Sequence, residues 1–223
     1  MSTGGQDARS HRQLSGRVVI ATHNAGKLAE MDALLAPYGV ATTSAGVLGL
    51  PEPDENGWMF AQNAAIKAQA AATATGLPAI ADDSGLCVEA LDGAPGLFTA
   101  DWAGKPRDFQ AAMARVIHEL ERRAVPAERW QAHFVSALVI AWPDGHQELF
   151  EGRVHGRCVW PPRGPGGFGY DPMFLPQGHE RTFGEMSADE KHGIPADGGR
   201  GLSHRARAFQ LLAAACLTPG KTQ

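Results

Sequence analysis

Short apolar runs alternate with polar loops along the first part of this chain and predict an alternation of strands and helices. Residues 17–22 form a β-branched run, which is typical of a strand buried on both faces. Residues 28–38 repeat leucine and methionine at helical spacing and stop before a glycine, so they predict a helix. Residues 60–75 are rich in alanine and predict a second helix, with residues 40–45 as a strand candidate between the two.

The second half of the chain predicts an amphipathic helix, a long hairpin and a closing helix. Residues 106–123 carry an apolar stripe at the spacing of a helix that packs on a core. Residues 129–142 and 147–160 predict two long strands joined by a Pro-Asp-Gly-His turn, and therefore an antiparallel hairpin. Ser203 is a suitable N-cap for the closing helix.

Two adjacent carboxylates interrupt an apolar run in the middle of the chain. Apolar residues lie on both sides of Asp82, Asp83, Ser84 and Gly85. Neighbouring carboxylates repel each other, and a cation held between them and another acid relieves that repulsion. One hypothesis is therefore a catalytic, metal-binding turn at the end of a buried strand. The alternative is an ordinary β-turn, because Asp, Ser and Gly are common turn residues.

A polar loop separates the first predicted strand from the first predicted helix. It consists of residues 23–27 and ends in Gly26 and Lys27. Backbone N–H groups and one ammonium group at a helix N-terminus favour the binding of an anion. The loop is not a Walker A motif, because that motif has Ser or Thr after the lysine and this chain has Leu28. A βα turn with a solvated lysine is the alternative.

Three further polar segments contain candidate site residues. Residues 51–57 form an acidic loop, which is either solvated or presents a carboxylate to a divalent cation. Residues 161–172 are dense in glycine and proline but carry paired aromatics, which favours a rigid loop with an aromatic platform over a linker. His204 and Arg205 occupy the first turn of the last helix, where the macrodipole disfavours positive charge. Such a conflict indicates either function or a frayed helix start.

Composition and charge limit the classes of protein that remain. The 223 residues are 43% hydrophobic and 20% charged, which is typical of a soluble protein of one domain or two closely joined lobes. The net charge of -4 argues against nucleic-acid binding. Three scattered cysteines predict buried thiols in a reducing compartment, and no apolar run reaches the ~20 residues of a membrane span. We therefore expect a cytoplasmic protein without nucleic-acid or membrane partners, with residues 1–16 as a mobile tail.

Several of these segments together resemble a known family. The segments, in chain order, are Thr22-His23-Asn24-Ala25-Gly26-Lys27, Gly57-x-x-Phe60-x-x-Asn63-Ala64-x-x-Lys67-Ala68, Ala81-Asp82-Asp83-Ser84-Gly85-Leu86, Gly93-Ala94-Pro95-Gly96, Gly166-Gly167-Phe168-Gly169-Tyr170-Asp171-Pro172 and Ser203-His204-Arg205. Their combination closely resembles the Ham1/RdgB-like family of non-canonical purine nucleoside triphosphate pyrophosphatases. The resemblance extends over nearly the whole chain, from about residue 18 to residue 217.

The resemblance implies a fold and a reaction. The implied fold is α/β, with a long twisted mixed β-sheet and flanking helices that form two lobes around a central cleft. Residues 17–218 would form this single two-lobed domain, residues 219–223 would be a C-terminal tail, and the protein would be a homodimer. The implied reaction is the hydrolysis of ITP, dITP, XTP or dXTP to the monophosphate and pyrophosphate with Mg²⁺.

The resemblance also implies roles for individual residues. Asp83 matches the catalytic proton acceptor and a metal ligand, while the acidic metal ligand matches Glu55, with Asp54 and Asp82 as further possible ligands. The residues implied to bind substrate are Thr22, His23, Asn24, Ala25, Gly26, Lys27, Lys67, Ser84, Phe168, Gly169, Tyr170, Asp171, Lys191, His204 and Arg205. Phe168 or Tyr170 would stack on the base.

The sequence departs from the usual family pattern at several positions, and two rival interpretations remain. His23 stands where a small or amide residue is common, and the segment between Lys191 and Ser203 is longer than usual. One rival is a Maf-like pyrophosphatase for other modified nucleotides, although the last helix start and the aromatic loop fit that family poorly. The other is a nucleotide-binding module without hydrolytic activity, which leaves the acidic pair without a purpose.

Overall fold

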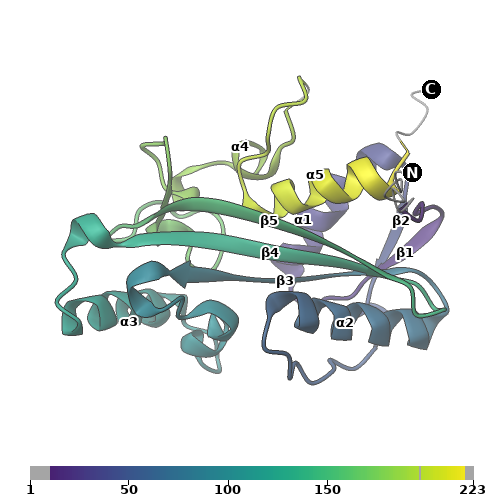
Figure 1. Cartoon of the computed structure of the whole chain (residues 1–223), viewed down its shortest axis with the longest axis horizontal. Coiled ribbons are helices and arrows are strands. Elements are labelled where there is room, and N and C mark those ends of the chain that lie inside the picture. Colours follow the sequence, from purple (N-terminus) through teal and green to yellow (C-terminus); the bar gives the residue numbers. More distant parts are fainter. Residues whose placement is uncertain (1–10, 196, 219–223) are drawn as a thin grey trace, which may run out of the picture.

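The computed structural model describes residues 11–195 and 197–218, and these contain a six-stranded mixed sheet in the order β2-β1-β3-β4-β5-β6 (Figure 1). The strands are β1 (Arg17–Ile20), β2 (Ala41–Ser44), β3 (Ala79–Val88), β4 (Gln131–Ala141), β5 (Gln147–Cys158) and β6 (Phe174–Pro176). β1 pairs in parallel with β2 and β3, and the remaining pairs are antiparallel. The α/β fold with a long mixed sheet and the predicted hairpin are confirmed.

Helices cover both faces of the long strands. They are α1 (Ala25–Leu35), α2 (Phe60–Thr75), α3 (Phe109–Arg122), α4 (Ala188–His192) and α5 (His204–Cys216). Figure 1 shows α2 and α3 on one side of β3, β4 and β5, with α1 and α5 on the other. Helix α1 begins three residues earlier than the apolar spacing predicts, because Asn24 caps it.

Apolar side chains form separate cores toward the two ends of the long strands. Near β1, alanines of α2 pack on β3 and β4, and the apolar faces of α1 and α5 pack on Ile80 and Leu138. At the other end, α3 packs with Leu86, Phe134 and the segment around β6. Alanine at the contact positions of α2 lets this helix lie close to the sheet, which brings the side chain of Lys67 near β3.

The acidic stretch is not a turn, and this corrects the prediction made from its residue types. β3 runs without a break from Ala79 to Val88 and pairs with β4 throughout, with Asp83 opposite Ala137. Gly85 serves a close approach rather than a turn, because a Cβ added there would lie 2.4 Å from the carbonyl oxygen of Gly96. β1 pairs with β3 only as far as Ile80, so the edge of β3 that carries the two acids is free of β1.

The predicted N-terminal tail is partly ordered against the fold, which corrects that expectation for residues 11–16. Leu14 is buried, its N–H donates to the carbonyl oxygen of Cys216, and Arg12 pairs with Asp144. The remainder of the predicted tails, residues 1–10 and 219–223, lies outside the described residues. In the described part of the chain no helix combines the length and the apolar character needed to cross a membrane. The three cysteines are buried free thiols, as predicted.

Candidate active site

A cleft of about 820 Å³ runs between the two apolar ends of the molecule, along the free edge of β3. Its walls come from the loop before α1, the acidic loop, α2, β3, residues 97–109, the aromatic loop and the start of α5. Of the predicted site residues, all but Ala25 and Gly26 line it. Gly26 instead lies under the Phe168 ring, where an added Cβ would come within 3.1 Å of the ring.

Asp82 and Asp83 point to opposite faces of the sheet, because successive residues of a strand alternate. Asp82 faces α1 and α5, where Lys27 Nζ and an Arg205 nitrogen each lie 2.9 Å from its Oδ2. Ser84 and Ser136 donate hydrogen bonds to the same carboxylate. Burial alone would raise the pKa of Asp82, but Arg205 and Lys27 hold it well below its ordinary value. Asp82 is therefore a permanent anion whose oxygens are already bonded.

Asp83 faces α2 and has a different environment. Lys67 Nζ lies 3.0 Å from Asp83 Oδ1 and 3.2 Å from Glu55 Oε2, so two carboxylates converge on one ammonium. Burial raises the pKa of Asp83 above its ordinary value, against the opposing effect of Lys67 and Lys27. A carboxylate of raised pKa is a stronger base than a free aspartate. Of the two acids, Asp83 is the one suited to accept a proton.

Glu30 of α1 is a site residue that the sequence interpretation missed. Its carboxylate pairs with Arg205 and accepts from His192 Nε2 at 2.8 Å. Burial opposes ionisation, yet Arg205 and His192 lower the pKa of Glu30 from 4.5 to about 2. Arg205 is itself buried, so Glu30 and Asp82 together fix its guanidinium at the floor of the cleft. Ser136, which holds Asp82 from β4, was also missed.

The predicted phosphate loop uses several of its polar groups for its own structure. Asn24 caps α1, and its Oδ1 accepts the N–H groups of Gly26 and Lys27, while Thr22 Oγ1 accepts the N–H of Asn24. His23 bonds the carbonyl oxygen of Leu50 and so ties this loop to the acidic loop. In the structure the N–H groups of Gly26 and Lys27 are therefore bonded to Asn24, whereas Lys27 itself lines the cleft.

The aromatic loop is held by a buried ion pair. Lys191 Nζ lies 2.6 Å from Asp171 Oδ2, and Asp171 also accepts the backbone N–H of Phe168 at 2.9 Å. Both charged side chains are almost fully buried. The Lys191 ammonium group lies 5.4 Å from the centre of the Phe168 ring. This pair fixes the position of Phe168, whose exposed ring forms part of the cleft wall.

Tyr170 is a buried residue of this loop, unlike Phe168. Its ring packs edge-on against Phe109, and its hydroxyl donates to the carbonyl oxygen of Thr99 at 3.1 Å. Burial raises the pKa of this phenol. With 1% of its surface exposed, Tyr170 supports the wall, and Phe168 is the aromatic residue that is available for stacking.

His204 lines the cleft with a largely buried imidazole ring. Its ring stacks on Phe134 with 4.8 Å between ring centres, and its Nδ1 is buried without a hydrogen-bond partner among the described residues. Burial, aided by Arg205 and Lys191, holds the pKa of His204 well below 6.5, so the imidazole is neutral. A neutral imidazole nitrogen without a partner can donate or accept a hydrogen bond from a bound molecule.

The groups that could hold a hard metal ion lie together on one side of the cleft. Asp83 and Glu55 supply the oxygen ligands that Mg²⁺ prefers, and both already meet at one cation, Lys67. Asp54 lines the same wall. Asp82 is unsuited to this role because its oxygens are occupied by Arg205, Lys27 and two serine hydroxyls.

The fold and the site define a class of α/β protein. Its cleft is large enough for a nucleotide, and its carboxylates and lysines suit a nucleotide that carries a metal ion. The family model of the Ham1 family matches residues 18–215. The chain therefore belongs to the Ham1 family.

Curated relatives and solved structures agree with this assignment. The dITP/XTP pyrophosphatase of Bradyrhizobium sp. (strain BTAi1) is 66% identical over 93% of this chain and 97% of that protein. The dITP/XTP pyrophosphatase of Rhodopseudomonas palustris is 64% identical over 93% of this chain and 99% of that protein. The solved structure of a HAM1 protein from Coxiella burnetii is 34% identical, covers 90% of this chain and 98% of its own, and has a TM-score of 0.79.

Proposed function

We propose that this protein hydrolyses the non-canonical purine nucleoside triphosphates ITP, dITP, XTP and dXTP to the monophosphate and pyrophosphate. The named activity of its relatives at 66% and 64% identity supports this reaction. The observation that carries the proposal is Asp83: a buried carboxylate with a raised pKa, held beside a second carboxylate by the lysine of α2. The reaction removes deaminated purines from the nucleotide pool.

Mg²⁺ is the cofactor that fits this donor set, because Asp83 and Glu55 present carboxylate oxygens at one point of the cleft. These two residues would hold the ion, and Asp54 is the neighbouring acid that could assist. When bound, Mg²⁺ neutralises charge on the phosphate oxygens and orients them.

Asp83 accepts the proton of the attacking water in this proposal. Its raised pKa makes it a stronger base, and the continuous pairing of β3 with β4 keeps it in place. Lys27 and Lys67 lie on opposite sides of β3 and bind the phosphate tail from both sides. Ser84 contributes a hydroxyl at the same edge, while Asp82 holds Lys27 and Arg205 in position.

The base is selected at the other end of the cleft. Phe168 stacks on the purine, and the neutral imidazole of His204, which lines the cleft, donates a hydrogen bond to the 6-keto oxygen of hypoxanthine or xanthine. Adenine presents an amino donor at that position, so a buried donor facing it would stay unpaired at a cost of ~1–3 kcal/mol. Lys191 and Arg205 act mainly through the groups they hold, since both are buried in ion pairs.

Residues 17–218 act as a single two-lobed domain in this proposal, and the protein is a cytoplasmic homodimer. The match of the Ham1 family model over residues 18–215 and the cleft between the two apolar ends support the single domain. Family resemblance supports the proposed dimer and location. Light scattering coupled to size-exclusion chromatography measures the molar mass directly. A mass of about twice the 23.6 kDa of one chain is expected, and the mass of a single chain would refute the dimer.

One assay separates this function from the rival interpretations. Purified protein is incubated with Mg²⁺ and ITP, XTP, dITP, ATP, GTP, dUTP or methyl-UTP, and pyrophosphate and phosphate are measured separately. Pyrophosphate release from the inosine and xanthosine nucleotides is expected. Release from the modified pyrimidine would indicate a Maf-like enzyme, binding without release would indicate a binding module, and phosphate release would indicate cleavage of a different bond.

Asp83→Asn tests the assigned base. The amide has almost the same shape but cannot accept a proton, so turnover should fall by a factor of about 100 or more while nucleotide binding stays measurable. Asp189→Asn is the matched control, because this exposed aspartate of α4 lies outside the cleft lining. Turnover of Asp83→Asn at the level of the control would refute the assignment.

A further inference from the structure

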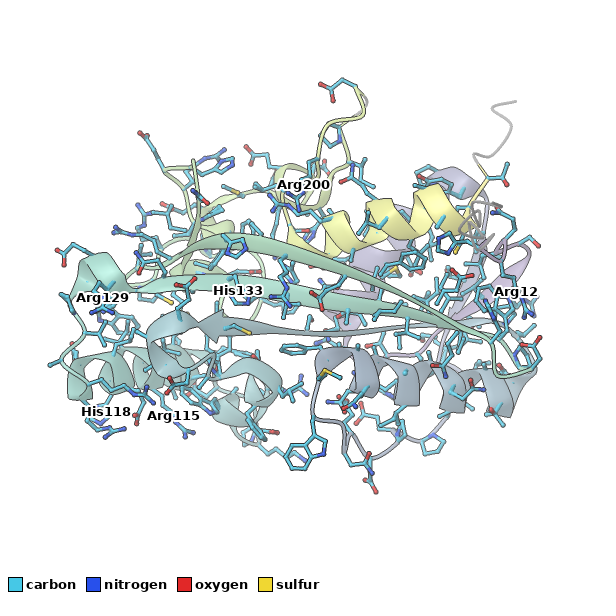
Figure 2. The ribbon with its side chains drawn as sticks, in the orientation of Figure 1. Arg12, Arg115, His118, Arg129, His133 and Arg200 are labelled. Atoms are coloured by element: carbon cyan, nitrogen blue, oxygen red, sulfur yellow. The ribbon has the colours of Figure 1, made fainter. Side chains whose placement is uncertain are left out.

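A second group of metal-ligating side chains lies on the sheet, away from the cleft lining. Glu89, His133 and His155 each offer a ligand atom, and the three atoms lie within 4.8 Å of one another. Figure 2 labels His133, which belongs to β4. Glu89 opens the short 3-10 turn after β3, and His155 belongs to β5.

The register of the sheet brings these three side chains together. His133 on β4 stands directly opposite His155 on β5, and Cys87 on β3 stands opposite His133. Glu89 lies two residues beyond Cys87 along the chain. Directly opposed residues of an antiparallel pair have Cβ atoms about 4.5–5.5 Å apart, and here the two imidazole ring centres are 5.3 Å apart. The two ligands are therefore positioned by strand pairing rather than by a loop.

The chemistry of this group differs from that of the acids in the cleft. Two imidazoles and one carboxylate suit zinc-class ions, whereas Mg²⁺ prefers oxygen ligands. Tetrahedral zinc with Zn–N distances of about 2.0–2.1 Å has ligand atoms about 3.3 Å apart, so small side-chain rotations would close the group around an ion. His133 Nδ1 is buried without a hydrogen-bond partner among the described residues, and either imidazole nitrogen can ligate a metal.

We propose that Glu89, His133 and His155 form a transition-metal site, which binds an ion of the zinc class and is separate from the nucleotide cleft. The site leaves a fourth position open on the solvent side, since Glu89 and His155 are exposed. A bound ion links the end of β3 to β4 and β5 and stabilises the folded state by an amount that grows with the logarithm of the free metal concentration above Kd.

Charged side chains near the three ligands influence the affinity of the site for a metal ion. Arg153 lies two residues before His155 on β5, and its positive charge acts on His133 against the binding of a cation. Its guanidinium is paired with Glu151 at 2.7 Å, which moderates this effect. Removal of the guanidinium by Arg153→Gln should therefore tighten metal binding, a change that a merely structural role of the histidines would not produce.

A second cluster of ligating side chains has to be separated from this one. His11, Glu148 and Cys216 also approach one another within 4.8 Å. The Glu148 carboxylate of this cluster is already hydrogen-bonded to His11 and to His146, so an ion there would have to displace existing partners. The experiment therefore includes a variant in each cluster.

The test is a titration of the full-length protein with Zn²⁺ against a chromophoric chelator, in millimolar Mg²⁺ so that the carboxylates of the cleft are occupied. Wild type, His155→Gln, Glu89→Gln and Arg153→Gln are compared with two control variants, His118→Gln on α3 (labelled in Figure 2) and His11→Gln. His155 is exposed, so its replacement should not disturb folding. Co²⁺ absorption gives a second readout, because nitrogen ligands in a four-coordinate site produce strong visible bands.

Wild type is expected to bind one zinc ion per chain. The zinc affinity of His155→Gln and of Glu89→Gln should be lower by a factor of about ten or more. The two control variants should match wild type, and Arg153→Gln should bind more tightly. Zinc affinity in His155→Gln equal to that of wild type, or a loss of the ion in His11→Gln instead, would overturn the proposal. The absence of zinc binding to wild type would overturn it as well.

Discussion

Replacement of Glu30 by glutamine tests the buried charge network beneath the cleft. Glu30 joins α1 to Arg205 and His192, and its side chain is about one-tenth exposed. Its pKa is lowered from 4.5 to about 2, which at about 1.36 kcal/mol per pKa unit corresponds to about 3 kcal/mol of folding free energy at neutral pH. Loss of one partner from a buried ion pair costs a similar amount, about 3–5 kcal/mol. Glu30→Gln should therefore lower the free energy of unfolding by about 3 kcal/mol at pH 7.

The pH dependence gives the sharper test. The pKa of Glu30 is lower in the folded state, so its contribution is fully present above pH 4.5 and is lost as the pH falls from 4.5 through about 2. Between pH 5 and pH 3 the wild-type protein should lose about 2 kcal/mol more stability than Glu30→Gln. The free energy of unfolding is measured by urea denaturation, with the fluorescence of the five tryptophans as the signal.

Glu121→Gln is the matched control, because this glutamate of α3 is exposed, and its replacement should change stability by less than about 0.5 kcal/mol. The network would be refuted as a source of stability if Glu30→Gln cost less than about 1 kcal/mol. Parallel pH profiles of wild type and Glu30→Gln would refute the pKa argument separately.

Three further predictions concern packing against α5, the wall of the cleft, and the general base Asp83. Gly152→Ala should destabilise the protein by about 1–3 kcal/mol in urea denaturation, because its Cβ would lie 2.2 Å from the α5 backbone. Gly46→Ala is the control, since its Cβ would meet only ordinary contacts and should leave the stability unchanged. Tyr170→Phe removes the hydrogen bond to Thr99 and should cost about 1 kcal/mol in the same assay, with pyrophosphatase activity retained. In Mg²⁺-free protein the Asp83 carboxyl group should titrate above the ordinary aspartate value, because burial raises its pKa; a titration at or below pH 3.8 in carbon NMR would contradict this.

The local elements were predictable because hydrophobic spacing and capping residues act within a few positions. The alanine-rich helix of residues 60–75 and the hairpin of β4 and β5 agree with their patterns. The strand through Asp82 and Asp83 did not agree with its pattern, because the charge of Asp82 is compensated by partners more than fifty positions away, such as Ser136 and Arg205. Nothing in the local sequence shows those partners, so a polar break was the natural interpretation.

Two of the missed residues did leave a signal in the sequence. Glu30 is three positions after Lys27 and so shares its face of α1, which points an acid toward the same site as the predicted phosphate lysine. Ser136 is the single polar residue in the apolar run of residues 134–141, and in the sheet it stands opposite Ser84. By contrast, which of Phe168 and Tyr170 keeps an exposed ring at the cleft depends on the contact between Tyr170 and Phe109 from a different part of the chain.

The three ion pairs at the cleft have a consequence for the release of product. Lys27, Lys67 and Lys191 each hold a carboxylate at 2.6–3.0 Å before any ligand enters. A phosphate group that binds a lysine therefore exchanges one anionic partner for another, and gains only the difference between the two contacts. Pyrophosphate that has lost its metal ion competes with carboxylates that cannot diffuse away. The carboxylates of the empty cleft thus compensate the lysines when the inorganic product departs.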